Sequence, residues 1–194
     1  MVISKAMLFA HMAQRSKEVA KYDPAMLAAA TLTLSCKSYD ETLSKTMVVL
    51  TFHHMIKKEY LLNLLSEKKF NLDKYLEKTE HMLFRVLGGN TSQKIAHEYV
   101  LFFTRNLIPV TEVGSCWQTF NTTVWKIISD FYMLEVCVEF TASQIAVVAM
   151  HVALMTCKVK SYLPSDWHQL FSPDLTMEIK NRLARVMIDI CSQK

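Results

Sequence analysis

Two segments of the sequence are apolar on every side of the helix that each would form. In residues 26–36 and 145–157, apolar and small side chains occupy nearly all positions instead of one stripe. A helix without a polar face must be enclosed by other helices, because any open side would hold apolar surface in water. Each segment is therefore predicted to be the buried central helix of a helical bundle.

The two apolar segments also match each other residue by residue. Leu27 and Ala28 align with Ile145 and Ala146, at a constant offset of 145 − 27 = 118 residues. The same offset relates three further pairs: Tyr22 and Phe140, Leu32 and Met150, and Leu34 and Val152. Such a repeat is far longer than the roughly 20–50 residues of a solenoid repeat. It predicts two helical bundles in tandem.

The boundary between the two bundles is expected near residue 90. Two of the only three glycines, Gly88 and Gly89, stand together there and precede Asn90. Glycine ends a helix readily because it adopts a left-handed backbone at little cost. We therefore assign residues 1–90 to the first domain and residues 91–194 to the second.

Helical spacing of apolar residues runs through nearly the whole chain, and no stretch shows convincingly the period of two that is typical of strands. The sequence therefore predicts an all-α protein. Asp23 before Pro24 is a typical helix start. Thr141 and Gln144 have the spacing of a capping box, in which each side chain satisfies a backbone donor of the first turn. The expected helices cover residues 2–16, 24–37, 42–59, 72–87, 94–107, 115–136, 143–158 and 174–191.

The composition is typical of a densely packed helical protein. Hydrophobic residues make up 51% of the chain, with only 3 Gly and 4 Pro. The five cysteines never form a C-x-x-C pair, which argues against a disulfide framework and a zinc site. The apolar runs are shorter than the roughly 20 residues of a membrane span, and the N-terminus lacks the pattern of a signal peptide. We expect an intracellular protein, nuclear or cytoplasmic, without a membrane partner.

No residue pattern indicates a catalytic site, a cofactor or a metal. His53 and His54 are adjacent, and adjacent side chains on a helix point about 100° apart, which does not favour one shared metal ion. The net charge of +4 is spread along the chain without a basic block. We expect no enzymatic activity, no small-molecule substrate and no strong attraction to nucleic acid.

The two halves differ at the end of their apolar segments. Lys37 ends the first segment, and the offset of 118 places Met155 opposite it. A lysine in the last turn of a helix has a structural explanation, since it interacts favourably with the helix dipole by about 0.3–1 kcal/mol. Any further role of Lys37 belongs to the first bundle alone.

The helix expected at residues 72–87 carries an aromatic side chain outside its apolar stripe. The stripe consists of Leu72, Leu76, Thr79, Leu83, Val86 and Leu87. Glu80 lies at its border, and Phe84 lies beyond it on the polar side. An aromatic ring beside a charge suits the centre of a protein interface, although packing of Phe84 against the second bundle explains the pattern equally well.

Several stretches together resemble the cyclin family. YDPAMLAAATLTLSCK (22–37) resembles the central helix of the first cyclin box, which ends in a lysine. LEKTEHMLFRVLGG (76–89) resembles the cyclin helix that carries a glutamate and ends in Val-Leu. VWKIISDFYMLEVCVEFTASQIAVVAMHVAL (124–154) and DWHQLFSPDLTMEI (166–179) are similar to the second box of transcription-type cyclins, cyclin Q among them. The resemblance covers nearly the whole chain.

The resemblance implies two tandem cyclin boxes and a regulatory subunit that binds a cyclin-dependent protein kinase. In cyclins, the lysine and glutamate that correspond to Lys37 and Glu80 form the centre of the surface that keeps the kinase's regulatory helix turned inward. A partner that binds this helix-in state raises kinase activity by a population shift. The implied role is kinase regulation in the cell cycle or in transcription. The kinase-binding residues are expected to be Lys37, Ser38, Tyr39, Glu80, His81 and Phe84.

The chain also departs from the cyclin pattern. The two acids that follow the cyclin lysine are shifted by about one position, to Asp40 and Glu41. Residues 88–91 replace an aromatic and an aliphatic residue that contact the kinase in cyclins. The resemblance begins at the second helix of the first box, so we expect the first bundle to lack its opening helix. Part of the apolar face of residues 26–36 is then expected to be exposed.

Two other functions stay open at the level of the sequence. A degenerate cyclin-fold scaffold would bind a protein without activating a kinase. General transcription factors that resemble the B-type initiation factor use the same paired bundles to clamp DNA. Such proteins tend to be strongly basic and to carry a zinc ribbon, and this sequence shows neither feature.

Overall fold

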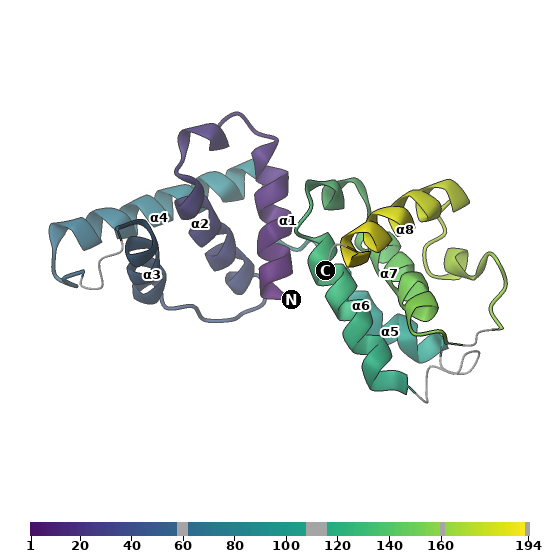
Figure 1. The fold of residues 1–194 in the computed structure, drawn as a ribbon. Helices are drawn as coiled ribbons and strands as arrows, with labels where there is room; N and C mark the ends of the chain where they lie inside the picture. The colour runs from purple at the N-terminus through teal and green to yellow at the C-terminus, as the bar shows by residue number, and fades with distance from the viewer. Residues whose placement is uncertain (58–61, 108–115, 160–161, 193–194) are drawn as a thin grey trace. The chain divides into compact units, whose positions relative to one another are not determined.

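The computed structural model describes residues 1–57, 62–107, 116–159 and 162–192 of the chain. Within these ranges the protein is all-helical, as predicted, and contains no strand (Figure 1). The helices divide between two compact units, unit 1 (Met1–Gln93) and unit 2 (Lys94–Lys194). The boundary between the units lies after Gln93, three residues beyond the boundary predicted from the sequence, which was after residue 90. None of the described helices is long and apolar enough to span a membrane.

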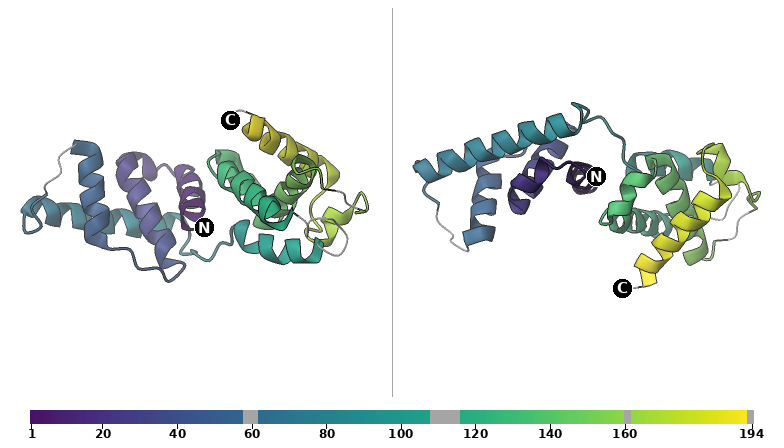
Figure 2. Two further views of the ribbon diagram at one scale, coloured as in Figure 1. Left: turned by 60° about the horizontal axis from the view of Figure 1, so that its bottom comes forward. Right: turned by 90° about the horizontal axis from the view of Figure 1, so that it is seen from above.

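Unit 1 is built around its second α-helix. Its elements are α1 (Val2–Gln14), η1 (Val19–Lys21), α2 (Pro24–Lys37), α3 (Lys45–Lys57) and α4 (Glu67–Val86). Helix α2 packs extensively against α1 and α4, and more narrowly against α3. The long helix α4 runs along one side of the unit, as the right-hand view of Figure 2 shows. Phe9, Ala30 and Leu83 are fully buried where these helices meet.

Unit 2 is built around α7. Its elements are α5 (His97–Leu107), α6 (Trp117–Phe131), η4 (Glu135–Glu139), α7 (Ala142–Thr156), η5 (Trp167–Leu170) and α8 (Met177–Ser192). Helix α7 packs against α5, α6 and α8 (Figure 2). Its residues 144–150 and 152–154 are all buried, which confirms the predicted enclosure as far as Leu154, whereas Met155 and Thr156 at the end of the helix are exposed.

The two central helices begin in the same register. Their N-cap residues, Asp23 and Thr141, are separated by 141 − 23 = 118 residues. The Asp23 carboxylate accepts hydrogen bonds from the backbone N–H groups of Ala25 (2.9 Å) and Met26 (3.1 Å). Thr141 and Gln144 form the predicted capping box. Both predicted helix starts are therefore confirmed.

The two central helices also end in the same way. Asp40 (φ 55°) and Lys158 (φ 51°) both have a left-handed backbone, and they too are 158 − 40 = 118 residues apart. In each helix, the N–H group of the next residue donates a hydrogen bond to the carbonyl five residues earlier. The Glu41 N–H donates to the Cys36 carbonyl, and the Val159 N–H donates to the Leu154 carbonyl, both at 3.0 Å. This is the hydrogen-bond pattern of a Schellman C-cap. The internal repeat thus extends to backbone conformation.

Several helix boundaries differ from the predicted ones. Helix α4 begins at Glu67 instead of residue 72, because the Ser66 hydroxyl accepts a hydrogen bond from the Lys69 N–H (3.2 Å) and caps an additional turn. Helix α6 ends at Phe131, and the residues predicted to continue it lead into η4. Residues 58 and 59 of the helix predicted at 42–59, and residue 115 of the helix predicted at 115–136, lie outside the described residues.

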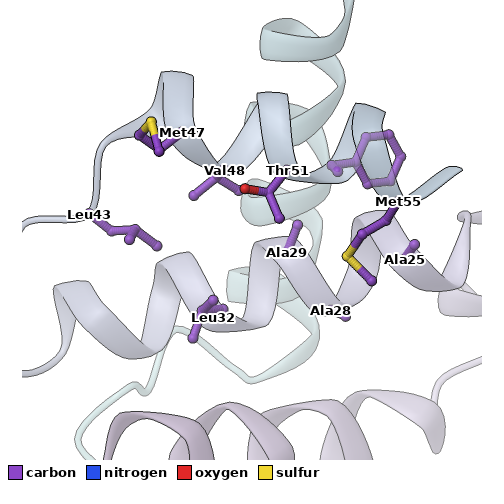
Figure 3. A pocket seen from close by; sticks show the side chains of 10 residues that line it. Ala25, Ala28, Ala29, Leu32, Leu43, Met47, Val48, Thr51 and Met55 are labelled. Carbon is purple, nitrogen blue, oxygen red and sulfur yellow. The ribbon is translucent and has the colours of Figure 1, made fainter. Parts of the chain in front are cut away.

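Helix α2 is not enclosed on every side, so the prediction of a fully buried central helix is wrong for unit 1. Ala28 is exposed, and Ala29 and Leu32 are only half-buried. These side chains line an apolar groove of about 300 Å³ between α2 and α3, opposite Met47 and Met55 (Figure 3). The groove exists because α1 and α4 cover the other sides of α2, while α3 contacts it only narrowly. Exposed apolar surface was expected on this segment.

Candidate functional site

Lys37 and Glu80 form an ion pair, although they are 43 residues apart in the chain. Lys37 is the last residue of α2, and Glu80 lies in the C-terminal half of α4. The Lys37 Nζ donates a hydrogen bond to the Glu80 Oε1. The Glu80 side chain is 11% exposed and that of Lys37 is 62% exposed. The protein thus holds the carboxylate, and the ammonium faces solvent.

The position of Glu80 follows from the apolar stripe of α4. Leu76, Thr79 and Leu83 are buried, as predicted for this stripe. The buried Thr79 hydroxyl still has a hydrogen-bond partner, because it donates to the Tyr75 carbonyl at 2.7 Å. Glu80 follows Thr79 directly, so the packing of α4 on α2 carries its carboxylate to the border of the buried surface.

The position of Lys37 follows from the C-cap of α2. The left-handed Asp40 ends the helix, and the Cys36 carbonyl accepts hydrogen bonds from the N–H groups of both Tyr39 and Glu41 (3.0 Å each). Lys37 is therefore in the final turn, where a cation also interacts favourably with the helix dipole. The structural role and a binding role of Lys37 are compatible.

An open pocket of about 320 Å³ surrounds the ion pair. Its lining side chains come from the end of α2, from α4 and from the segment after α4, and they are Leu34, Lys37, Ser38, Glu80, His81, Phe84 and Thr91. The Phe84 ring stays 44% exposed beside the charged pair. The pocket therefore combines a fixed cation with an accessible aromatic surface.

Two glycines lie in the chain between the pocket residues Phe84 and Thr91. Gly88 (φ 69°) and Gly89 (φ 72°) end α4 with a left-handed backbone, as the sequence predicted. The Gly89 N–H donates to the Phe84 carbonyl at 2.8 Å, which turns the chain back toward the ring. Glycine has no side chain to cover Phe84. The ring is left accessible, and Thr91 is brought to the pocket.

Five of the six residues predicted for the site lie together in this pocket. The exception is Tyr39, which is half-buried outside it. The ammonium of the buried Lys5 on α1 lies 4.4 Å from the centre of the Tyr39 ring, a cation–π contact. Ser38 lines the pocket, and its hydroxyl donates to the Ser35 carbonyl at 2.7 Å.

Sequence reasoning missed Leu34 and Thr91. Leu34 precedes Lys37 by one helical turn, and residues three apart lie on the same face of a helix, so this spacing could have identified it. Thr91 has no such signal, because its place depends on how the chain turns at the two glycines.

A second ion pair on α4 resembles the first in chemistry but not in surroundings. Lys45 of α3 pairs with Glu77, whose carboxylate is 56% exposed. The hydrogen bond from Lys45, together with its charge, lowers the pKa of Glu77. Neither residue lines the pocket around Phe84. This pair offers a matched control for the Lys37–Glu80 pair.

The candidate site combines hydrogen-bond donors with apolar surface. An ammonium has three N–H donors, and the Glu80 Oε1 takes one of them, so others can reach carbonyl or carboxylate oxygens of a partner. Phe84 adds apolar area of the kind found at interface centres. Among the described residues, no group of three or more His, Cys, Asp or Glu side chains is arranged to hold a metal ion. None of the known protein-family models matches this chain.

Proposed function

We propose that the protein is a cyclin-like regulatory subunit that binds a cyclin-dependent protein kinase through the pocket around Lys37, Glu80 and Phe84. The observation that carries the proposal is the Lys37–Glu80 ion pair, which joins the end of a central helix to a second helix beside an exposed aromatic ring. The resemblance of these two helices to the lysine and glutamate helices of cyclins supports the same assignment. Unit 2 has Met155 in place of the lysine, so the proposed surface belongs to unit 1.

The proposed mechanism is a shift in the kinase population. An active kinase needs a glutamate on its regulatory helix to pair with the lysine that aligns the ATP phosphates. A partner that binds only this helix-in state raises its population, and a shift from 1:99 to 99:1 requires about 5.5 kcal/mol of differential binding. Such discrimination needs binding groups in fixed positions. The buried Glu80 carboxylate supports this requirement because it orients the Lys37 ammonium.

The proposal is tested by measuring the binding of the full chain to a panel of purified cyclin-dependent kinases. Lys37→Ala and Glu80→Ala should each weaken binding of the cognate kinase roughly 10- to 100-fold, as expected for residues at an interface centre. The control variants Lys45→Ala and Glu77→Ala remove the more exposed ion pair between α3 and α4. Their affinity should stay within about twofold of the unmodified chain, because exposed pairs contribute little.

Two outcomes would contradict the proposal. One is that no kinase of the panel binds, and the other is that a bound kinase tolerates the loss of both Lys37 and Glu80. Circular dichroism of each variant excludes unfolding as the cause of lost binding. A third result is that binding of the kinase requires Lys37 and Glu80 but does not raise its activity. That result would support the binding surface and would indicate a scaffold instead of an activator.

A further inference from the structure

A separate pocket in unit 2 surrounds a buried lysine. It has a volume of about 240 Å³ and lies between the C-terminal half of α7, the segment that leads into η5, and the first turn of α8. Its polar lining groups are Lys180, His151 and Ser165. Its apolar walls include Met155, Pro164 and Trp167. The pocket thus has a polar part beside an apolar part.

Lys180 is an unusual group at this place. It is only 7% exposed, and burial lowers the pKa of its ammonium. In the part of the chain that the structure describes, no carboxylate pairs with it. An ammonium that is largely buried and has no counter-ion is only partly compensated by water from the pocket, and this raises the cost of its charge. A negatively charged ligand in the adjoining pocket would lower that cost.

The histidines near Lys180 add no further positive charge at neutral pH. Burial, assisted by the Lys180 charge, lowers the pKa of His151 to about 4. The same two causes lower the pKa of the buried His168, and Asp166 acts on it in the opposite direction. Both imidazoles are neutral at pH 7. Among the described lining residues, the pocket therefore presents one cation, with the His151 ring and the Ser165 hydroxyl as further hydrogen-bonding groups.

We propose that this pocket binds a small organic carboxylate. Its carboxylate pairs with Lys180, and its apolar part lies against Met155, Pro164 and Trp167. The single cation among the described lining residues matches a monoanion, whereas a phosphate dianion would leave one charge without a partner among them. The pocket volume of about 240 Å³ leaves room for a small acid such as butyrate. The site is in unit 2 and does not depend on the kinase-binding proposal.

The test is a calorimetric titration of the full chain with sodium butyrate at constant ionic strength. Butyramide, which has nearly the same shape without the charge, is the ligand control. Lys180→Met keeps most of the side-chain volume and should bind butyrate roughly 10- to 100-fold more weakly, the loss expected for a charge-assisted hydrogen bond. Arg185→Met is the matched variant, because it removes an exposed cation of the same helix and should leave affinity unchanged.

Nuclear magnetic resonance makes the test independent of how the variant folds. In the unmodified chain, butyrate should shift the Trp167 indole and His151 ring signals saturably, and butyramide should not. Absence of these shifts overturns the proposal, as does equal butyrate affinity of a folded Lys180→Met variant. Tighter, Lys180-dependent binding of inorganic phosphate than of butyrate would overturn the assigned ligand class.

The same titration identifies the source of the carboxylate. An acetylated Ala-Ala-Leu peptide with a free C-terminus is compared with its amidated form and with butyrate. Tighter binding of the free peptide than of butyrate assigns the site to a peptide C-terminus. The reverse order assigns it to a free acid, and equal binding of the free and amidated peptides contradicts a carboxylate site.

Discussion

The central helices α2 and α7 share one backbone frame but have different surroundings. Both have capped starts and left-handed ends at positions 118 residues apart. On α7, Ala146 and Met150 are completely buried, whereas the equivalent Ala28 and Leu32 on α2 line an open groove. The same pattern of apolar residues thus produces an enclosed helix in one unit and a partly open helix in the other.

The difference arises from the helix that covers this face in unit 2. The elements α1, η1 and α2 follow one another as α6, η4 and α7 do, so α5 has no counterpart among the described elements of unit 1. Helix α5 packs on α7, and the Thr104 hydroxyl lies 3.7 Å from the Met150 sulfur. Burial of a central helix therefore depends on how many neighbours surround it, in addition to its own sequence.

The largest effect is expected from truncating the equivalent side chains Met150 and Leu32. Met150→Ala should lower the free energy of unfolding of unit 2 by about 2–5 kcal/mol, because it leaves a cavity in a closed core. Leu32→Ala should lower that of unit 1 by only roughly 1 kcal/mol, because Leu32 already borders the groove.

Urea unfolding can follow the two units separately. All three tryptophans lie in unit 2, so their fluorescence reports that unit, while helical circular dichroism reports both. The tryptophans are Trp117, Trp125 and Trp167. If Met150→Ala and Leu32→Ala lowered the free energy of unfolding of their units equally, the result would contradict the difference in enclosure between the two helices.

A smaller effect is expected from enlarging the equivalent alanines. Ala146 has no exposed surface, so Ala146→Leu overfills the core of unit 2 and should lower its free energy of unfolding by about 1–3 kcal/mol. Ala28 faces the groove, and Ala28→Leu should stay within about 0.5 kcal/mol of the unmodified chain. Thermal unfolding of both variants measures the comparison. Destabilisation by Ala28→Leu as large as that by Ala146→Leu would show that the groove is closed in solution.

The smallest effect is expected at the helix ends, where the two units are alike. Lys158→Gly should raise the free energy of unfolding of unit 2 by up to about 1 kcal/mol, because glycine adopts the left-handed backbone without strain. Asp40→Gly should raise that of unit 1 by less, since aspartate tolerates this conformation better than lysine. Lys158→Ala, which keeps the strain, is the control in the same urea experiment. If Lys158→Ala raised the free energy of unfolding as much as Lys158→Gly, the effect would come from removal of the lysine charge instead of from relief of backbone strain.

Much of the fold could be predicted because it depends on local patterns. Asp23 and Thr141 cap their helices through hydrogen bonds to residues two or three positions away. The stripe of α4 follows from the helical period, and Gly88 and Gly89 end that helix through their own backbone freedom. Such features need no knowledge of distant residues. Cap spacing, helical period and glycine position can therefore be recognised in the sequence without the tertiary structure.

Part of the candidate site was beyond this kind of reasoning. The approach of Lys37 to Glu80 was anticipated through the cyclin resemblance, since spacing alone does not relate residues 43 positions apart. Tyr39 lies outside the pocket and its ring contacts Lys5 of α1, and no sequence pattern connects these two residues. The position of Thr91 depends on the direction of the chain after Gly89.

By itself, the sequence determined the all-α character, the 118-residue repeat and the capped ends of both central helices. These features depend on contacts within a few turns, whose geometry the helix itself imposes. Only the tertiary structure decided that Ala28 and Leu32 of α2 border an open groove while Ala146 and Met150 of α7 are completely buried, and that the ammonium of Lys37 meets the buried carboxylate of Glu80. Both outcomes depend on which distant helices pack together, and packing partners are not encoded in the period of a single helix.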